Sequence, residues 1–142
     1  MTKAKSYVKC QITNSEGSIL LLKRSKEDTL GGIWESVGGG VDKGESPQQA
    51  ILREVLEESG LNVIPKFKGK FTFNDCKSGN PYRVHLFNAK IESEVINLEN
   101  NPDHEDFVWL NGDNINAFLA AGNKIDSWTL THTLMKDRKS VV

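Results

Sequence analysis

The feature that most constrains the fold is a helix whose two ends are clearly marked, directly after three consecutive glycines. The stretch GGGVDKGESPQQAILREVLEESGL covers residues 38–61. Ser46 is a favoured N-cap residue, Pro47 suits the first helical position, and Gln49 can complete a capping box with Ser46. Gly60 stands where helices commonly end. These signals predict a helix that begins at Pro47 and ends at about Gly60.

Three glutamates near the end of this helix conflict with its local stability. Glu54, Glu57 and Glu58 occupy positions i, i+3 and i+4, so they share one face. Like charges at these spacings repel by about 0.2–0.5 kcal/mol per pair, and acids in the last turns oppose the helix dipole. Arg53 alone does not neutralise them. Because such conflicts are expected at functional sites, we expect a cation to bind here.

The apolar residues of the helix, and the segments on its N-terminal side, indicate a layered α/β structure. Leu52, Val55 and Leu56 cluster on a face that can contact a core. Residues 7–13 and 18–24 show the pattern of a β-hairpin. A loop that leads into a short strand is expected over residues 25–37, after which the glycines supply backbone freedom.

Strand and helix patterns also follow the central helix. Residues 61–65, 66–73 and 82–91 read as a β-meander, with a turn over 74–81. The remaining expected elements are a polar loop over 97–106, a strand over 107–110, a helix over 115–122 that ends at Gly122, and a last helix over 128–136 capped by Ser127. The order predicts an α/β fold in which a mixed β-sheet is sandwiched between helices, in a single domain over residues 1–142.

Composition and charge restrict the classes of partner. The chain has 142 residues and a net charge of −1 from 18 basic and 19 acidic residues, so no global field favours nucleic acid or anionic membranes. It contains no run of 18 or more apolar residues and no N-terminal signal-peptide pattern. We therefore expect a cytoplasmic protein without membrane or nucleic-acid partners. Cys10 and Cys76 are expected to be free thiols.

The glutamates belong to a longer spaced pattern. From Gly39 to Leu61 the sequence reads G-x5-E-x7-R-E-U-x-E-E-x-G-U, where U is aliphatic. By chance this pattern would match on the order of once in 10⁷ to 10⁸ chains of this length. It resembles the Nudix box, and Trp34 before the glycines and the later FVWL segment agree with the same family. Val37 departs from the proline that many members carry there, which affects loop stiffness and not the chemistry.

The resemblance implies the Nudix fold, with the box at residues 39–61, and a divalent-metal-dependent pyrophosphohydrolase. It implies that Glu54, Glu57 and Glu58 are catalytic and bind Mg²⁺ or Mn²⁺, together with a backbone carbonyl at Gly38 or Gly39. These are hard cations that prefer oxygen ligands. The resemblance further implies that Arg53 belongs to the catalytic residues. Its implied role is to pair with Glu45 and so orient the carboxylates that bind the metal. The residues with structural roles in the motif are Gly39, Glu45 and Gly60.

The general base and the substrate contacts lie outside the box. For the base we favour Glu105, with Asp103, Asp106 or a glutamate of the helix as alternatives. Arg24 is a candidate for binding a substrate phosphate, the alternative being a surface ion pair. Trp34 is a candidate for stacking on a base, although core packing is the alternative for it, as for the two other tryptophans.

Several substrate classes are compatible with the resemblance. The chain looks most like MutT-type members, which cleave nucleoside triphosphates, including oxidised ones, to the monophosphate and pyrophosphate. Nucleotide sugars, ADP-ribose and dinucleoside polyphosphates stay open as substrates. A sensor that binds nucleotides without turnover is a different class, as is isopentenyl diphosphate isomerase, for which neither Cys10 nor Cys76 is well placed. The expected partner is therefore a nucleotide or another nucleoside diphosphate derivative, and a homodimer is compatible with the family.

Overall fold

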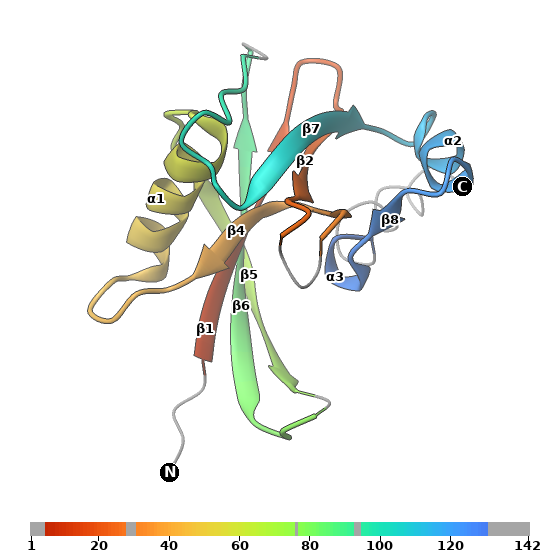
Figure 1. Cartoon of the computed structure of the whole chain (residues 1–142). Helices are drawn as coiled ribbons and strands as arrows, with labels where there is room; N and C mark the ends of the chain where they lie inside the picture. The colour runs from red at the N-terminus through yellow and green to blue at the C-terminus, as the bar shows by residue number, and fades with distance from the viewer. Residues whose placement is uncertain (1–4, 28–30, 76, 93–94, 131–142) are drawn as a thin grey trace.

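A computed structural model describes residues 5–27, 31–75, 77–92 and 95–130 (Figure 1). Its strands are β1 (Lys5–Thr13), β2 (Ile19–Arg24), β3 (Ile33–Glu35), β4 (Val37–Gly40), β5 (Lys66–Asn74), β6 (Pro81–Lys90), β7 (His104–Leu110) and β8 (Lys124–Ile125). Its helices are α1 (Pro47–Ser59), α2 (Ile115–Ala120) and α3 (Ser127–Thr129).

The strands form one branched, mixed sheet. The main path runs β5-β6-β1-β2-β3-β8, while β4 pairs with β1 and β7 pairs with β2. β1 is parallel to β6 over its whole length and antiparallel to β4 and β2. The prediction of a mixed sheet is therefore confirmed.

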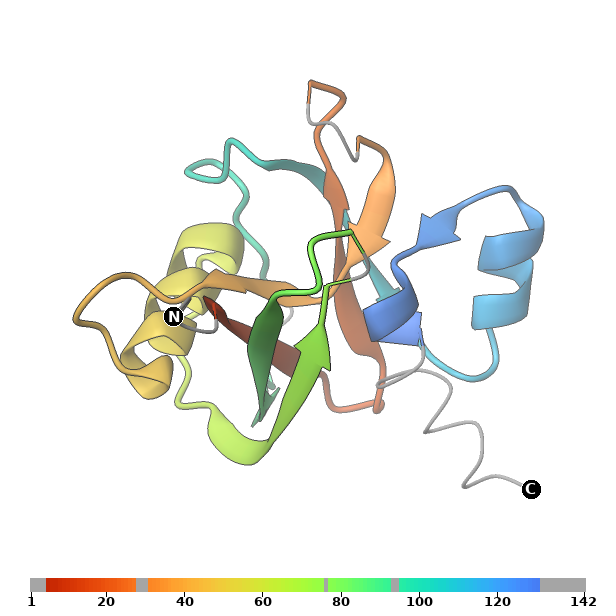
Figure 2. The same ribbon diagram turned by 90° about the horizontal axis from the view of Figure 1, so that it is seen from below.

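Two apolar cores lie on opposite sides of this sheet. α1 covers one side, and α2 and α3 lie on the other (Figures 1 and 2). The buried residues of the α1 core include Val8, Cys10, Ile12, Leu20, Leu22, Ala50, Ile51, Val55 and Phe87. The buried residues of the second core are Ile19, Leu21, Trp34, Leu110 and Ile115. Because successive residues of β2 point to opposite faces, this strand contributes to both cores. The sandwich of helices around the sheet is confirmed.

The predicted ends of α1 are confirmed. The Ser46 hydroxyl accepts from the Gln49 backbone N–H at 3.1 Å, and the Gln49 side chain accepts from the Ser46 N–H at 2.9 Å. Gly60 has a left-handed φ of 74° and donates its N–H to the Leu56 carbonyl. A residue with a Cβ is strained in this conformation, which explains the glycine.

The predicted core face of α1 is partly wrong. Val55 is buried, but Leu52 and Leu56 are 39% and 56% exposed. Ile51, Val55 and Glu58 face the sheet instead, at the i, i+4 and i+7 spacing of one helical face. Apolar clustering alone misplaced the face because the fold buries a glutamate of this helix.

Several other segments differ from the predictions. Residues 61–65 form no strand, since Pro65 lacks a donor and Ile64 is 84% exposed, so β5 and β6 make a hairpin and not a meander. The glycines 38–40 are not a loop but pair with β1 as β4. Residues 104–106, predicted as loop, extend β7 along β2.

The C-terminal helices agree only in part with the predictions. α2 ends at Ala120, two residues before Gly122, whose φ is 95°. α3 already includes Ser127, and the capping side chain is Asp126, whose carboxylate accepts from the Thr129 N–H at 3.2 Å. The rest of the predicted last helix, and Cys76, lie outside the described residues. Cys10 is a free thiol in the α1 core.

No helix in the described part of the chain combines the length and the apolar character needed to span a membrane.

Candidate active site

Arg53 joins the acidic residues of α1 to the loop that precedes the helix. Its Nε and Nη2 bind the two carboxylate oxygens of Glu45 at 2.8 and 2.9 Å. Nη1 lies 2.7 Å from Glu54 and 3.3 Å from Glu57, and Nη2 donates to the Gly40 carbonyl at 3.0 Å. One guanidinium thus contacts Glu45, Glu54, Glu57 and the end of β4.

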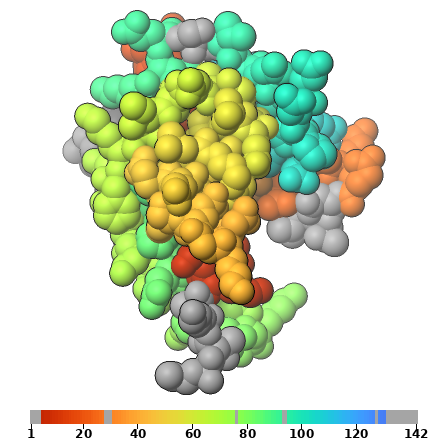
Figure 3. Space-filling model, turned by 90° about the vertical axis from the view of Figure 1, so that its left-hand side faces the viewer, coloured from red at the N-terminus to blue at the C-terminus, as the bar shows by residue number. Residues whose placement is uncertain are grey.

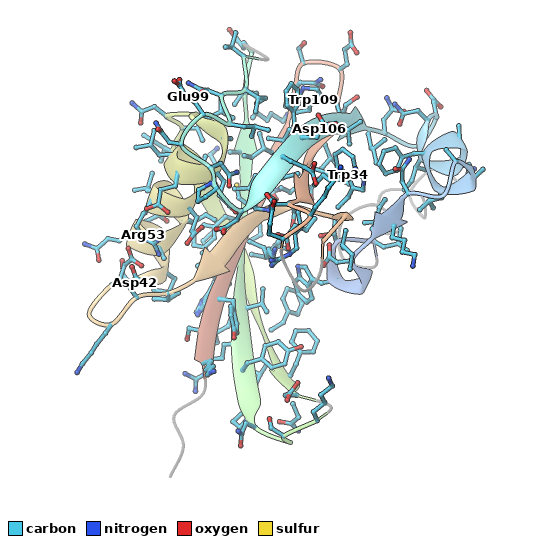
Figure 4. The ribbon with its side chains drawn as sticks, viewed as in Figure 1. Trp34, Asp42, Arg53, Glu99, Asp106 and Trp109 are labelled. Carbon is cyan, nitrogen blue, oxygen red and sulfur yellow. The ribbon has the colours of Figure 1, made fainter. Side chains whose placement is uncertain are left out.

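The Arg53–Glu45 pair is ionised and held tightly. The pKa of Glu45 is lowered to about 2, mainly by the hydrogen bond from Arg53. A hydrogen bond from the Asp42 backbone N–H, 3.0 Å long, lowers it further. The hydrogen bond between Arg53 and Glu45 also raises the pKa of Arg53. Figure 4 shows Arg53 and Asp42 on the same side of the molecule, where β4 leads into α1.

Glu54 lies directly against the glycines of β4. A Cβ placed on Gly39 would be 2.7 Å from the Glu54 carboxylate, so only glycine leaves room for this side chain. Burial is the main effect on Glu54 and raises its pKa, although Arg53 is in contact with it. The positive charge of Arg53 therefore does not fully offset the cost of burying the ionised Glu54 carboxylate.

Glu58 is more deeply buried than Glu54 and points to the same strand. It accepts from the Gly38 N–H at 2.8 Å, and only 7% of the residue is exposed. Burial raises the pKa of Glu58 to about 8. Gly38 in turn must be glycine, because a Cβ there would overlap the Val8 carbonyl oxygen of the neighbouring strand.

His104 connects Glu58 to a second buried carboxylate. Its Nδ1 lies 3.3 Å from Glu58 and its Nε2 lies 2.8 Å from Glu35, on β3. Glu35 also pairs with Lys9 at 3.3 Å and with Arg24 at 3.2 Å. Burial opposes ionisation of Glu35, but the His104 hydrogen bond and the two nearby cations outweigh it. Together they lower its pKa to about 2.

Among the three glutamates of α1, Glu57 is placed differently from Glu54 and Glu58. Glu57 has a side chain that is 55% exposed and contacts Arg53 at the edge of the site. Figure 3 shows α1 (yellow) as an open face of the molecule, flanked by the loop after β4 (orange) and by the segment that leads into β7 (teal). Glu57 can therefore change its rotamer, whereas Glu54 and Glu58 are held by their surroundings.

The donor chemistry fits a hard divalent cation. Within the described ranges, no three Asp, Glu, His or Cys side chains converge closely enough to hold an ion as they stand. In this arrangement Arg53 contacts both Glu54 and Glu57. However, the set offers carboxylate and backbone carbonyl oxygens, which such cations prefer. Burial also leaves Glu54 and Glu58 with raised pKa values, so added positive charge would stabilise both anions.

The acids considered for the general base stay at the surface. Asp103, Glu105 and Asp106 are all exposed. Figure 4 shows Asp106 on β7, apart from Arg53 and closer to Trp34. The residue of this segment whose side chain reaches the α1 acids is His104. In the sequence His104 is a histidine in the polar loop between Asp103 and Glu105, which alone is weak evidence for a site.

The two substrate-contact candidates have structural partners. Arg24 binds Glu35, as the ion-pair alternative expects, although this partner is buried and not at the surface. Trp34 is 5% exposed and packs edge-on against Phe118, with a ring-centroid distance of 5.3 Å, as the core-packing alternative expects.

Sequence reasoning missed Lys9, Glu35 and Asn101. Asn101 donates to the Glu58 backbone carbonyl at 2.8 Å and accepts from the N–H of His104. Lys9 lies on the β1 face opposite the core residues, a position that strand alternation could have marked as available for a site. No local pattern marks Glu35, because its partners Lys9 and His104 are distant in the sequence. Asn101 contacts the nearby His104, but its contact with Glu58 spans 43 residues.

Comparison with known proteins identifies relatives for nearly the whole chain. The family model of the NUDIX domain matches residues 4–132. CTP pyrophosphohydrolase from Escherichia coli (strain K12) is 41% identical over 98 residues, which cover 69% of this chain and 70% of that protein. An RNA pyrophosphohydrolase from Wolbachia pipientis subsp. Culex pipiens (strain wPip) is 29% identical over 136 residues, covering 82% of each chain. The crystal structure of the MutT protein from Methanosarcina mazei Go1 superposes with a TM-score of 0.64 at 26% identity, covering 78% of this chain and 79% of that one.

Proposed function

The chain belongs to the Nudix family and is a pyrophosphohydrolase that acts on phosphoric anhydrides, and from this premise we propose that its substrate is a nucleoside triphosphate. In the proposed reaction water attacks one phosphorus, the anhydride bond breaks, and the products are the nucleoside monophosphate and pyrophosphate. The reaction class is supported by the α1 acids packed against β4. The choice of a triphosphate is supported by the 41% identity with a CTP pyrophosphohydrolase.

Nudix hydrolases generally require divalent metal ions, and for this chain we propose Mg²⁺, with Mn²⁺ as a substitute. When bound, the cation offsets negative charge on the phosphate oxygens of the substrate. Glu54, Glu57 and Glu58 are the proposed ligands, with a backbone carbonyl at Gly39. Arg53 orients Glu54 through a contact at 2.7 Å and also contacts the more exposed Glu57 at 3.3 Å.

Glu105 is the proposed general base, with Asp103 as the alternative. Both are exposed residues next to His104, at the start of β7. Each is tested by replacing the carboxylate with the matching amide, Glu105→Gln or Asp103→Asn. Loss of the base lowers kcat and removes the acidic limb of the pH profile, whereas loss of a surface charge does neither.

The test of the proposed function is Mg²⁺-dependent phosphate release, coupled in separate wells to pyrophosphatase and to phosphatase. The panel holds the ordinary and 8-oxo nucleoside triphosphates, nucleotide sugars, ADP-ribose and dinucleoside polyphosphates. We expect signal with pyrophosphatase on a triphosphate. Signal only with phosphatase would reassign the substrate to nucleotide sugars or ADP-ribose. Binding without any turnover would reassign the protein as a nucleotide sensor.

A second candidate substrate is the 5′-triphosphate end of RNA. It is supported by the RNA pyrophosphohydrolase relative, which matches 82% of the chain, and by a groove of about 410 Å³. Lys66, Lys68 and Lys90 line this groove together with the polar residues Gln11 and Asn88. These cations can contact backbone phosphates. Adding a 5′-triphosphate RNA oligonucleotide to the panel separates the candidates, because a substrate of this kind would be cleaved faster than the free nucleotide.

A further inference from the structure

His104 occupies a bridging position between two carboxylates that belong to different elements. The residue begins β7, and its side chain is 2% exposed. Nδ1 faces Glu58 of α1 at 3.3 Å, and Nε2 faces Glu35 of β3 at 2.8 Å. Each ring nitrogen therefore serves a different acid, and only one of these acids belongs to the α1 set.

The position of the His104 ring is itself fixed. Asn101 accepts from the His104 backbone N–H, and its side-chain oxygen also lies 3.1 Å from the ring Nδ1. The Asn101 amide donates to the backbone carbonyl of Glu58 at 2.8 Å, which ties this segment to the end of α1. At the other end of the ring, Glu35 is held by the cations of Lys9 and Arg24.

The Glu58 carboxylate is thus oriented from two sides. One oxygen accepts from the Gly38 N–H at 2.8 Å, and the other faces His104. A carboxylate on a long side chain that is held in this way loses little rotamer freedom when it takes up a cation, so its affinity for the cation is higher.

We propose that His104 is a positioning residue, which holds the Glu58 carboxylate ready for a divalent cation by anchoring it to Glu35. The inference rests on the proposed function, in which Glu58 is a ligand of that cation. A purely structural role of His104 would satisfy buried polar groups without affecting cation affinity.

Two substitutions separate these roles, because each keeps one of the two contacts. In His104→Asn, the amide nitrogen replaces Nδ1 and retains the contact with Glu58. In His104→Gln, the amide nitrogen replaces Nε2 and retains the contact with Glu35. Each variant loses one polar contact of the ring, at 3.3 Å to Glu58 or at 2.8 Å to Glu35, and thermal unfolding measures the structural damage in each.

The measurement is Mn²⁺ binding to the protein without nucleotide, followed by electron paramagnetic resonance. We expect both variants to bind Mn²⁺ about 10–100-fold more weakly than the wild type, because each breaks one of the two contacts through which His104 anchors Glu58 to Glu35. Excess Mg²⁺ should restore kcat of His104→Gln, since the reacting groups are intact. Mn²⁺ affinity equal to that of the wild type in either folded variant would overturn the inference.

A third variant keeps the test decisive where the histidine variants fail to fold. Glu35→Gln retains the size of the anchor but removes its charge, so it should also weaken Mn²⁺ binding without touching Glu58. Unchanged binding by this variant contradicts the anchoring role. Wild-type protein that neither binds Mn²⁺ nor hydrolyses the panel refutes the proposed function itself, whereas wild-type binding with unaffected variants refutes only the role of His104.

Discussion

Glu57 and Glu58 are adjacent in the sequence, but the fold gives their carboxylates different environments. The Glu57 side chain is 55% exposed and contacts Arg53 at 3.3 Å, whereas Glu58 is buried against Gly38 and His104. At the residue scale, a change in Glu57 should therefore affect the reaction, while a change in Glu58 should also affect folding.

Glu57→Gln should reduce kcat/KM by at least about 100-fold, because the proposed site loses an anionic ligand. Its free energy of unfolding should change by less than about 0.5 kcal/mol, since the exposed contact with Arg53 contributes little. The measurements are steady-state kinetics and thermal unfolding. Glu99→Gln is the matched control, because Glu99 is an exposed acid outside the box and lies apart from Arg53 (Figure 4). Full activity in Glu57→Gln would remove Glu57 from the ligand set.

Glu58 should make metal-free stability depend on pH. Its pKa is raised from 4.5 to about 8 in the folded protein, so the folded state holds the proton more tightly than the unfolded state. The resulting stability is fully present below about pH 4.5 and is lost as the pH rises through 8. Glu58→Gln cannot ionise and does not lose it.

In EDTA, the Tm of Glu58→Gln relative to the wild type should therefore rise between pH 6 and pH 8.5, by at least about 3 °C. Thermal unfolding at both pH values measures this difference. Mg²⁺ should reduce it, since a cation stabilises the wild-type carboxylate. A difference that is constant over this range would show that Glu58 is ionised throughout.

At the scale of elements, the three glycines of β4 differ in whether the fold or the candidate site requires them. A Cβ on Gly38 would overlap the Val8 carbonyl, a Cβ on Gly39 would meet the Glu54 carboxylate, and a Cβ on Gly40 would meet nothing within 4 Å. Gly38 is thus required by the packing of the sheet, Gly39 leaves room for Glu54, and Gly40 can be replaced.

Alanine substitutions along β4 should separate these roles. Gly38→Ala should destabilise the protein by about 3 kcal/mol or more, because it forces β4 away from β1. Gly39→Ala should fold but lose most activity, since the displaced group is the flexible end of Glu54. Gly40→Ala should fold with a Tm close to that of the wild type. Thermal unfolding and kinetics on the same three proteins provide the measurement, and equal behaviour of the three would contradict the packing described for β4.

The elements also show how far sequence reasoning extends. The ends of α1 were predictable because caps are local: Ser46, Gln49 and Gly60 act within a few residues. The direction in which α1 faces was not, because burial of Glu58 depends on Gly38 and His104, which are distant in the sequence. The β4 pairing was missed for a similar reason, since glycine has a low strand propensity and only the partner strand β1 reveals it.

At the scale of the whole molecule, the branched sheet brings the site together. β4 pairs with β1, and the chain continues from β4 into α1. β7 pairs with β2, which places His104 on the other side of Glu58. The box residues could be predicted because their spacing lies within 23 residues. The network of Lys9, Glu35 and His104 could not, because it is created by pairing among strands separated by 26 and 69 residues.

The central proposal is that this chain uses the α1 acids to hydrolyse the anhydride between the α- and β-phosphates of a nucleoside triphosphate. The most direct measurement is ³¹P NMR of the triphosphate that it turns over fastest, in ¹⁸O-labelled water with Mg²⁺. We predict equal amounts of nucleoside monophosphate and pyrophosphate, with ¹⁸O in one of them and no turnover in EDTA. Release of orthophosphate with a nucleoside diphosphate, or turnover that persists in EDTA, would contradict the account.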